Sequence, residues 1–265
     1  MTTRIAVAGG LGRMGQSIIE LAALSSEFEV VGVTISQGDQ VPLQSHVSLD
    51  LFTQDISQAV DGADVLVDFT SPAALSSHAS ACIDGNVGWV LGTTGLERKH
   101  DAAVETAANN VPVCRSANFS TGINLMLQLV ELVSAAVDDD TDLEVIEAHH
   151  RHKVDAPSGT ALAIGEAMAS SRGHSLDSSA VYAREGITGE RIPGSIGFAT
   201  VRGGDIIGEH TALFASEGER LEVTHRAGTR KAFARGALRA ASWLVDRSSG
   251  LYDMRDVLRP TDAHD

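Results

Sequence analysis

The chain has 265 residues, 43% of them hydrophobic, which is enough to bury the core of one large domain or two moderate ones. Its formal net charge of -15 argues against nucleic acid as the partner, because phosphate binding depends on clustered Lys and Arg, and no apolar run reaches the roughly 18 residues that a membrane span requires. Cys82 and Cys114 are isolated in the sequence, so we expect two reduced thiols in a cytoplasmic protein.

A glycine-rich turn follows the first predicted strand. Residues 5–8 form a short apolar run typical of a strand buried on both faces of a parallel sheet, and a helical pattern begins at Gln16. Between them, Gly9, Gly12 and Gly15 have the spacing of a variant dinucleotide-binding fingerprint, in which backbone N–H groups face a pyrophosphate. The order of strand, glycine turn and helix favours a dinucleotide site over the alternative, an ordinary tight connection.

The second predicted strand, residues 28–35, ends where NAD-binding enzymes place a carboxylate on the ribose hydroxyls. The sequence there is Ser36-Gln37. Neither side chain repels the 2′-phosphate of NADPH, and neither is an Arg that would bind it. The cofactor preference therefore stays open, with a lean towards NADPH.

Strands and helices continue to alternate along the first part of the chain. Strands are predicted at residues 63–70, 87–95 and 111–114, and helices at 71–83 and 97–108. This alternation predicts an α/β fold with a Rossmann-like, doubly wound parallel sheet, whose ligands lie at the carboxyl ends of the strands. Asp68, Thr70 and Gly92 to Thr94 fall at such ends, although Ser71 or Thr93 could equally cap a helix.

The pattern changes after a long apolar helix predicted over residues 122–137. Strands with period-two alternation follow at residues 197–202, 206–215 and 220–225, and a last helix is predicted at 233–245. Such strands are typical of an antiparallel sheet with one solvated face. The sequence thus predicts a second, α+β domain with a mixed or antiparallel sheet.

The densest cluster of titratable groups is residues 147–160, which read EAHHRHKVDAPSGT. From His149 to Lys153 the sequence supplies three imidazoles, one guanidinium and one amine in an otherwise acidic chain. Good helix formers begin at Ala161, so a helix should start between about residues 156 and 160. Cations followed by the positive end of a helix predict a pocket for an anion.

Two other interpretations of this cluster remain. It could be a solvated loop in which Ser158 or Asp155 only caps the helix. It could also be a metal site of His149, His150, His152 and Asp155. We rank that site last and predict no metal, because adjacent histidines on an extended segment point to opposite faces and no second cluster of ligands lies nearby.

The segment from Glu147 to Ala161 closely resembles the signature of the bacterial 4-hydroxy-tetrahydrodipicolinate reductases, the dihydrodipicolinate reductases of lysine and diaminopimelate synthesis. Six further segments are similar to that family's motifs and occur in its order, namely residues 12–15, 68–70, 92–95, 117–120, 197–202 and 250–256. Agreement over the whole chain is far more specific than any single fingerprint.

The resemblance implies NAD(P)H-dependent reduction of a small cyclic dicarboxylate by a homotetramer. It implies a dinucleotide-binding domain at residues 1–120, a substrate-binding and oligomerisation domain at 121–230, and a segment at 231–265 that returns to the first domain. His149 would be the catalytic acid/base and Lys153 the proton donor.

Two sets of binding residues are also implied. The substrate carboxylates would bind His150, Gly159 and Thr160. The cofactor, NADPH or NADH, would bind Gly9, Gly10, Leu11, Gly12, Arg13, Met14, Ser36, Gln37, Gly92, Thr93, Thr94, Ser116, Ala117, Asn118 and Phe119. Many members of the family carry an acidic residue followed by Arg where this chain has Ser36-Gln37, which leaves the choice between NADPH and NADH open.

Hydride delivery to an unsaturated carbon needs a cofactor pocket and an acid, and the two halves of this chain supply one each. Another two-domain NAD(P)-dependent dehydrogenase of small acids remains an alternative. So does a nicotinamide-sensing binding protein without turnover. Such a protein would need no acid near the cofactor, so His149 and Lys153 count against it.

Overall fold

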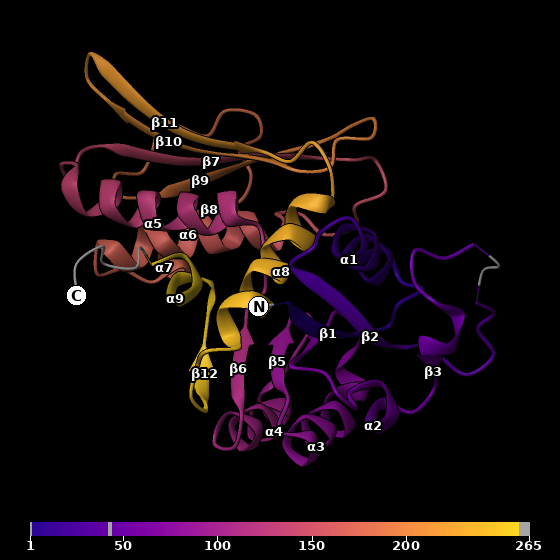
Figure 1. The fold of residues 1–265 in the computed structure, drawn as a ribbon. Coiled ribbons are helices and arrows are strands. Elements are labelled where there is room, and N and C mark those ends of the chain that lie inside the picture. Colours follow the sequence, from indigo (N-terminus) through magenta and orange to yellow (C-terminus); the bar gives the residue numbers. More distant parts are fainter. Residues whose placement is uncertain (1, 42–43, 260–265) are drawn as a thin grey trace. The chain divides into compact units, whose positions relative to one another are not determined.

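The computed structural model describes residues 2–41 and 44–259 (Figure 1). The predicted C-terminal segment extends to residue 265, and its last part, 260–265, lies outside the described residues. Contacts within the chain divide it into two compact units, Met1–Thr121 with Arg230–Asp265, and Gly122–Thr229. Each unit has its own sheet and core.

The first unit contains a seven-stranded sheet in which every strand pairs in parallel, in the order β12-β6-β5-β4-β1-β2-β3. Its strands are β1 (Thr3–Ala8), β2 (Phe28–Thr34), β3 (Phe52–Thr53), β4 (Val65–Asp68), β5 (Gly88–Leu91), β6 (Pro112–Arg115) and β12 (Gly250–Tyr252). The order reverses on either side of β1, as in doubly wound dinucleotide-binding sheets. The predicted Rossmann-like sheet is confirmed.

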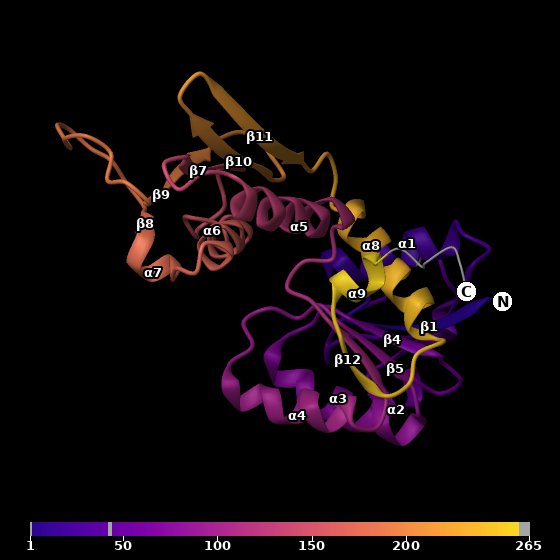
Figure 2. The ribbon, with the colours of Figure 1, turned by 90° about the vertical axis from the view of Figure 1, so that its left-hand side faces the viewer.

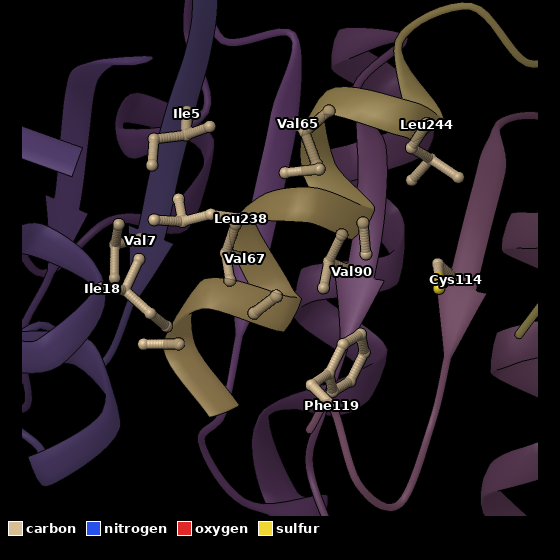
Figure 3. Close-up of a cluster of buried hydrophobic side chains, with 14 of the residues drawn as sticks. Ile5, Val7, Ile18, Val65, Val67, Val90, Cys114, Phe119, Leu238 and Leu244 are labelled. Atoms are coloured by element: carbon tan, nitrogen blue, oxygen red, sulfur yellow. The ribbon is translucent and has the colours of Figure 1, made fainter. Parts of the chain in front are cut away.

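Helices cover both faces of this sheet. One face packs against α1 (Arg13–Ala23), α8 (Lys231–Leu244) and α9 (Met254–Leu258), and the other packs against α2 (Ile56–Ala59), α3 (Leu75–Gly85) and α4 (Arg98–Ala108). Short 3-10 turns lie at Leu49–Leu51 and Pro72–Ala74. Side chains of a strand alternate between faces: Ile5 and Val7 pack with Leu238 of α8 (Figure 3), and Ala6 packs on the other side.

The register of the sheet brings several loops to one edge. Ala8 pairs with Asp68, Asp68 with Leu91, and Leu91 with Arg115. These residues end β1, β4, β5 and β6. The loops that follow them therefore leave the sheet at the same carboxyl edge, which is where ligands bind in open parallel sheets.

The second unit has a five-stranded sheet in the order β11-β10-β7-β9-β8. Its elements are α5 (Thr121–Ala136), β7 (Asp142–His149), α6 (Gly159–Ser171), α7 (Leu176–Ser179), β8 (Ala180–Val181), β9 (Ile196–Arg202), β10 (Glu209–Ser216) and β11 (Glu219–Arg226). The pairs β10–β11 and β10–β7 are antiparallel, but β7–β9 and β8–β9 are parallel.

The sheet is thus mixed, which confirms the prediction of a mixed or antiparallel sheet in its first form, and β7 pairs with β9 in parallel. The reason is the connection between β7 and β9, which passes through α6 and so returns the chain to the start of the sheet. The two helices α5 and α6 lie against one face of the sheet (Figure 2).

Alternation along β7 determines which of its side chains face α5 and α6. Leu143 and Val145 are buried in the core of the second unit with Ile164 and Met168 of α6. Glu147 and His149 have the same parity, so they continue this buried face to the end of the strand.

No helix in the described part of the chain has the length and apolar character that crossing a membrane requires.

Candidate active site

The centre of the site is a pair of buried side chains at the end of β7. The Nδ1 atom of His149 lies 2.6 Å from Oε2 of Glu147, and the two residues are 8% and 1% exposed. The register of the sheet places His210 of β10 opposite Glu147, and Arg202 of β9 opposite His149. Three neighbouring strands therefore build this site.

The Glu147 carboxylate accepts hydrogen bonds from three residues. Arg202 donates from Nη1 and Nη2, each at 2.8 Å, and the backbone N–H of Ser158 donates at 3.1 Å. Burial opposes ionisation of Glu147, but the bonds from Arg202, His149 and Ser158 hold the pKa of its carboxyl below the usual value. An ionised carboxylate can only accept, so His149 carries its proton on Nδ1 and leaves Nε2 for other partners.

The environment of His149 favours its neutral form in the free protein. Burial lowers the pKa of His149, the Glu147 carboxylate raises it, and the charges of Lys153 and Arg202 lower it again, with a net shift downward. A substrate that brings negative charge beside the ring would raise this pKa and favour the protonated ring. The group is suited to take up and deliver a proton near neutral pH.

A second buried histidine lies against the first. The rings of His210 and His149 meet edge to face with centroids 5.1 Å apart, and Nε2 of His210 lies 3.0 Å from Oγ of Ser158. Burial, followed by the neighbouring His149, lowers the pKa of His210 to about 4. His210 is therefore neutral at physiological pH, and its Nδ1 has no hydrogen-bond partner among the described residues.

The loop after β7 carries the remaining predicted cations. The Lys153 side chain is 21% exposed, and its amine forms an ion pair of 2.8 Å with Asp155. His150 is half-buried, with an Nδ1 that has no partner among the described residues, whereas Arg151 and His152 are exposed. Arg202 also donates to the backbone carbonyl of Asp155 at 2.6 Å, so the same guanidinium holds both the strand and the loop.

Helix α6 begins at Gly159, within the range predicted from the sequence. Ser158 is its N-cap and accepts from the Ala161 N–H at 3.1 Å, so the capping interpretation is correct for Ser158. No acidic residue lies in the first turn, which leaves the positive end of the helix unopposed there. Gly159 is exposed and Thr160 half-buried, so an anion can approach the backbone at this point.

The glycine turn of the first unit has the geometry of a pyrophosphate-binding loop. Gly9 has a φ of 68°, and a Cβ at Gly15 would lie 2.3 Å from the Gly9 carbonyl oxygen, so the turn and the close approach of α1 both require glycine. No side chain caps α1 at Gly12, and its first turn holds no acidic residue. These features fit a dinucleotide. Leu11, Arg13 and Met14 are exposed or half-buried.

A carboxylate lies at the end of β2, although Ser36 and Gln37 themselves carry none. Gly38 adopts a φ of 88°, and Oδ2 of Asp39 accepts the backbone N–H of Ser36 at 3.0 Å. Ser36, Gln37 and Asp39 are all exposed. The predicted preference for NADPH depends on the absence of a carboxylate at this position. Because the Asp39 carboxylate lies beside Ser36, that argument for NADPH no longer holds.

Two loops at the carboxyl edge of the parallel sheet are anchored by Asp68, which is 1% exposed; one of them holds Gly92 to Thr94, which are predicted to bind the cofactor. Its carboxylate accepts the Thr70 hydroxyl at 2.7 Å and the Thr93 hydroxyl at 3.3 Å, and it lies 2.8 Å from Nδ1 of His78. Thr93 is buried and Thr94 exposed. The Thr93 hydroxyl is therefore used in a hydrogen bond within the protein, whereas Thr94 is exposed and available to a ligand.

The loop after β6 is held by its own side chains. The Ser116 hydroxyl donates to the Asn118 carbonyl at 2.8 Å, and the Asn118 side chain accepts the Ser120 N–H at 2.8 Å. Phe119 is buried, and its ring meets that of Phe69 edge to face with centroids 5.3 Å apart. A Cβ at Gly92 would lie 2.2 Å from the Phe69 ring, which explains glycine in that loop. Ala117 is exposed.

Within the residues that the structure describes, no three His, Cys, Asp or Glu side chains gather in an arrangement that could hold a metal ion. Both cysteines are free and buried. Burial raises the pKa of the Cys114 thiol to about 12 and raises that of Cys82 further. Neither thiol is activated as a nucleophile.

Comparison with known families decides the family of the chain. Residues 3–119 match the model described as "Dihydrodipicolinate reductase, N-terminus", and residues 122–258 match "Dihydrodipicolinate reductase, C-terminus". The chain belongs to the dihydrodipicolinate reductase family. The resemblance found from the sequence motifs is thereby confirmed.

Individual members of this reductase family are similar over nearly the whole chain. The 4-hydroxy-tetrahydrodipicolinate reductase of Saccharophagus degradans is 49% identical over 97% of this chain and 99% of its own length. That of Thiobacillus denitrificans is 48% identical with the same coverage. A dipicolinate-bound dihydrodipicolinate reductase from Paenisporosarcina sp. TG-14 superposes with a TM-score of 0.78 at 26% identity, covering 96% of this chain and 98% of that one.

Proposed function

We propose that this protein catalyses the NAD(P)H-dependent reduction of 4-hydroxy-tetrahydrodipicolinate to tetrahydrodipicolinate, in lysine and diaminopimelate biosynthesis. The observation that carries the proposal is the buried pair of His149 and Glu147 beside the start of α6, in a chain of the reductase family. The reaction adds one hydride and one proton to the substrate and releases its hydroxyl group as water.

His149 and Lys153 supply the proton in this proposal. His149 presents Nε2, because Nδ1 is held by Glu147. Lys153 lies four residues further along the chain in the loop after β7, and its charge acts on the His149 ring. Its ion pair with the half-exposed Asp155 is open to solvent, so a substrate carboxylate can replace Asp155 at little cost.

The substrate carboxylates bind at the start of α6 in this proposal. Gly159 and Thr160 offer first-turn N–H groups, and the Thr160 hydroxyl can add a further donor. His150 contributes a half-buried ring whose Nδ1 is free of partners among the described residues. Hydrogen-bond donors that are already in position stabilise a bound anion more than donors that must first be ordered, because no free energy is lost in reorganising them.

The cofactor binds at the carboxyl edge of the parallel sheet in the first unit. The loops that would hold it are Gly9 to Met14, Ser36 and Gln37, Gly92 to Thr94, and Ser116 to Phe119. When bound, the dihydronicotinamide supplies the hydride. The uncapped start of α1 would receive the pyrophosphate, and Asp39 would lie beside the adenosine ribose, while Asp68 keeps the loop of Thr93 in place.

We propose further that the first unit is the dinucleotide-binding domain and that the second binds substrate and forms a homotetramer. In the second unit, Ile146 and Val201 lie on the sheet face away from α5 and α6 and are 40% and 50% exposed. A partner subunit can cover such a face. The two free thiols support a cytoplasmic location.

The test is consumption of NADPH and of NADH by the purified protein when 4-hydroxy-tetrahydrodipicolinate is generated enzymatically in the same cuvette. We expect oxidation of the cofactor that depends on both the protein and the substrate. A dehydrogenase of another small acid would leave this substrate untouched. A nicotinamide-sensing protein would bind the cofactor without oxidising it. Either result would overturn the proposal.

A further inference from the structure

The Glu147 carboxylate connects two functional groups that come from different elements. Its Oε2 accepts Nδ1–H of His149 at 2.6 Å, and its Oε1 accepts the backbone N–H of Ser158 at 3.1 Å. Ser158 is the N-cap of α6, directly before Gly159 and Thr160. One buried carboxylate therefore fixes both the proposed acid and the helix start that would bind the substrate carboxylate.

We propose that Glu147 is a positioning residue of the reaction: it holds His149 in the tautomer that presents Nε2, and it sets the distance between that ring and the start of α6. This inference rests on the proposed function and extends it. Catalytic groups must be held within a fraction of an ångström of their working geometry, and a partner with a second hydrogen bond is the usual means. Glu147 itself is buried, and its carboxylate oxygens bond to His149, Ser158 and Arg202, so we assign it a role that acts through His149.

A purely structural ion pair would not explain this arrangement. Burying a carboxylate and a guanidinium together gives little net stability, because desolvation offsets their attraction. Arg202 alone also satisfies both carboxylate oxygens, with one Nη on each. The carboxylate nevertheless makes two additional bonds, and both go to the proposed site.

Glu144 is a matched comparison on the same strand. Its carboxylate accepts two bonds from Arg184, at 3.0 Å and 2.8 Å, and is also paired with Arg191. Within the described residues, its side-chain bonds go to Arg184 and Arg191, neither of which is a proposed site residue. Glu144 and Glu147 are thus both Arg-paired carboxylates of β7, and only Glu147 bonds the proposed acid.

The charges around His149 make the inference measurable. Glu147 faces the ring from its own strand, Arg202 from β9, neutral His210 from β10, and Lys153 from the following loop. Glu147 is the negative charge in this set, and it raises the pKa of His149 while burial, Lys153 and Arg202 lower it. Without that carboxylate the pKa of His149 falls further.

The direction in which the kcat profile shifts with pH follows from the role of the His149 ring as a proton donor. A proton donor works in its protonated form, so the rate decreases as the pH rises through the pKa of that donor. Loss of the Glu147 charge therefore moves the decreasing limb of the kcat profile to lower pH. A residue that only stabilises the fold would change the amount of active protein and leave the position of this limb unaltered.

The experiment compares kcat as a function of pH for the full chain, its Glu147→Gln variant and its Glu144→Gln variant. For Glu147→Gln we expect kcat to fall by about 10- to 100-fold, the decreasing limb to move down by about one pH unit, and the KM for the cofactor to stay within about two-fold. Glu144→Gln should keep the limb of the wild type. A Glu147→Gln enzyme with the wild-type limb and nearly full kcat overturns the inference.

A second measurement does not depend on a folded variant. The ¹⁵N shifts of labelled histidine in the unaltered protein, with His149 assigned by comparison with His149→Gln, report which nitrogen of the neutral ring carries the proton. We expect Nδ1–H. A neutral ring protonated on Nε2 overturns the inference even if the wild type turns over, whereas absence of turnover in the wild type counts against the proposed function alone.

Discussion

His149, the last residue of β7, lies against Gly208, the residue before β10, and the fit depends on the missing side chain of the glycine. A Cβ at Gly208 would lie 3.0 Å from Nε2 and 3.3 Å from Cδ2 of His149. Gly208 is buried and directly precedes β10. Nε2, the nitrogen from which we propose that the protonated ring donates to the substrate, is therefore the atom that a larger residue at this position would crowd.

Gly208→Ala should lower kcat by about 10-fold or more, because the added methyl group displaces Nε2 from its working position. Gly203→Ala, at the other end of the same loop, is the control, since a Cβ there meets nothing within 4 Å. Steady-state rates of both variants, with thermal unfolding measured in parallel, separate misplacement of the ring from loss of stability. Equal rates for Gly208→Ala and Gly203→Ala would refute this role of Gly208.

Asp39 should discriminate between the two cofactors. Its carboxylate lies at the end of β2 and would repel the 2′-phosphate of NADPH. In Asp39→Asn, we expect the ratio of kcat/KM for NADPH to that for NADH to rise by about 10-fold, an effect of about 1.4 kcal/mol. Ser36→Glu, which adds a second carboxylate, should move the ratio in the opposite direction. An unchanged ratio in both variants would place the adenosine ribose elsewhere.

Lys153 and Thr160 should affect different kinetic constants. If Lys153 delivers a proton as well as binding, Lys153→Ala loses far more kcat than affinity, whereas Thr160→Ala mainly raises the KM for the substrate. Both constants must be measured for both variants. An unchanged kcat in Lys153→Ala would reduce this residue to an electrostatic anchor and leave His149 as the acid.

The protein should be a homotetramer in solution. The open face of the second sheet exposes Ile146 and Val201 on adjacent strands, and apolar side chains on such a face favour burial against another subunit. Light scattering coupled to size exclusion measures the mass directly. We expect four times the 27.7 kDa of one chain, and a monomer mass at assay concentration would contradict the prediction.

Local sequence patterns were sufficient for much of the fold. The glycine turn and the start of α6 at Gly159 follow from short stretches in which backbone conformation and capping depend on neighbouring residues. The parallel pairing of β7 with β9 could not be predicted in this way, since period-two alternation shows which face is buried but not which strand lies alongside.

The hydrogen-bonded network of Arg202, Glu147 and His149 could not be predicted from the sequence either. Arg202 is 55 residues from Glu147, and only the register of the sheet brings the two together. One local signal was present: Glu147 and His149 stand two residues apart in a strand, which puts both side chains on one face. Asp39 was missed because the positive φ of Gly38 returns the chain towards Ser36, a turn that Ser36-Gln37 alone does not reveal.

The most direct test of the account is the rate of His149→Gln with 4-hydroxy-tetrahydrodipicolinate and saturating cofactor. Gln keeps a polar side chain of similar reach but cannot donate a proton as an acid, so we predict a kcat lower by about 10²- to 10⁴-fold, with the Kd of the cofactor changed by less than about two-fold. A His149→Gln enzyme that retains nearly the full rate of the wild type would contradict the assignment of His149 as the acid.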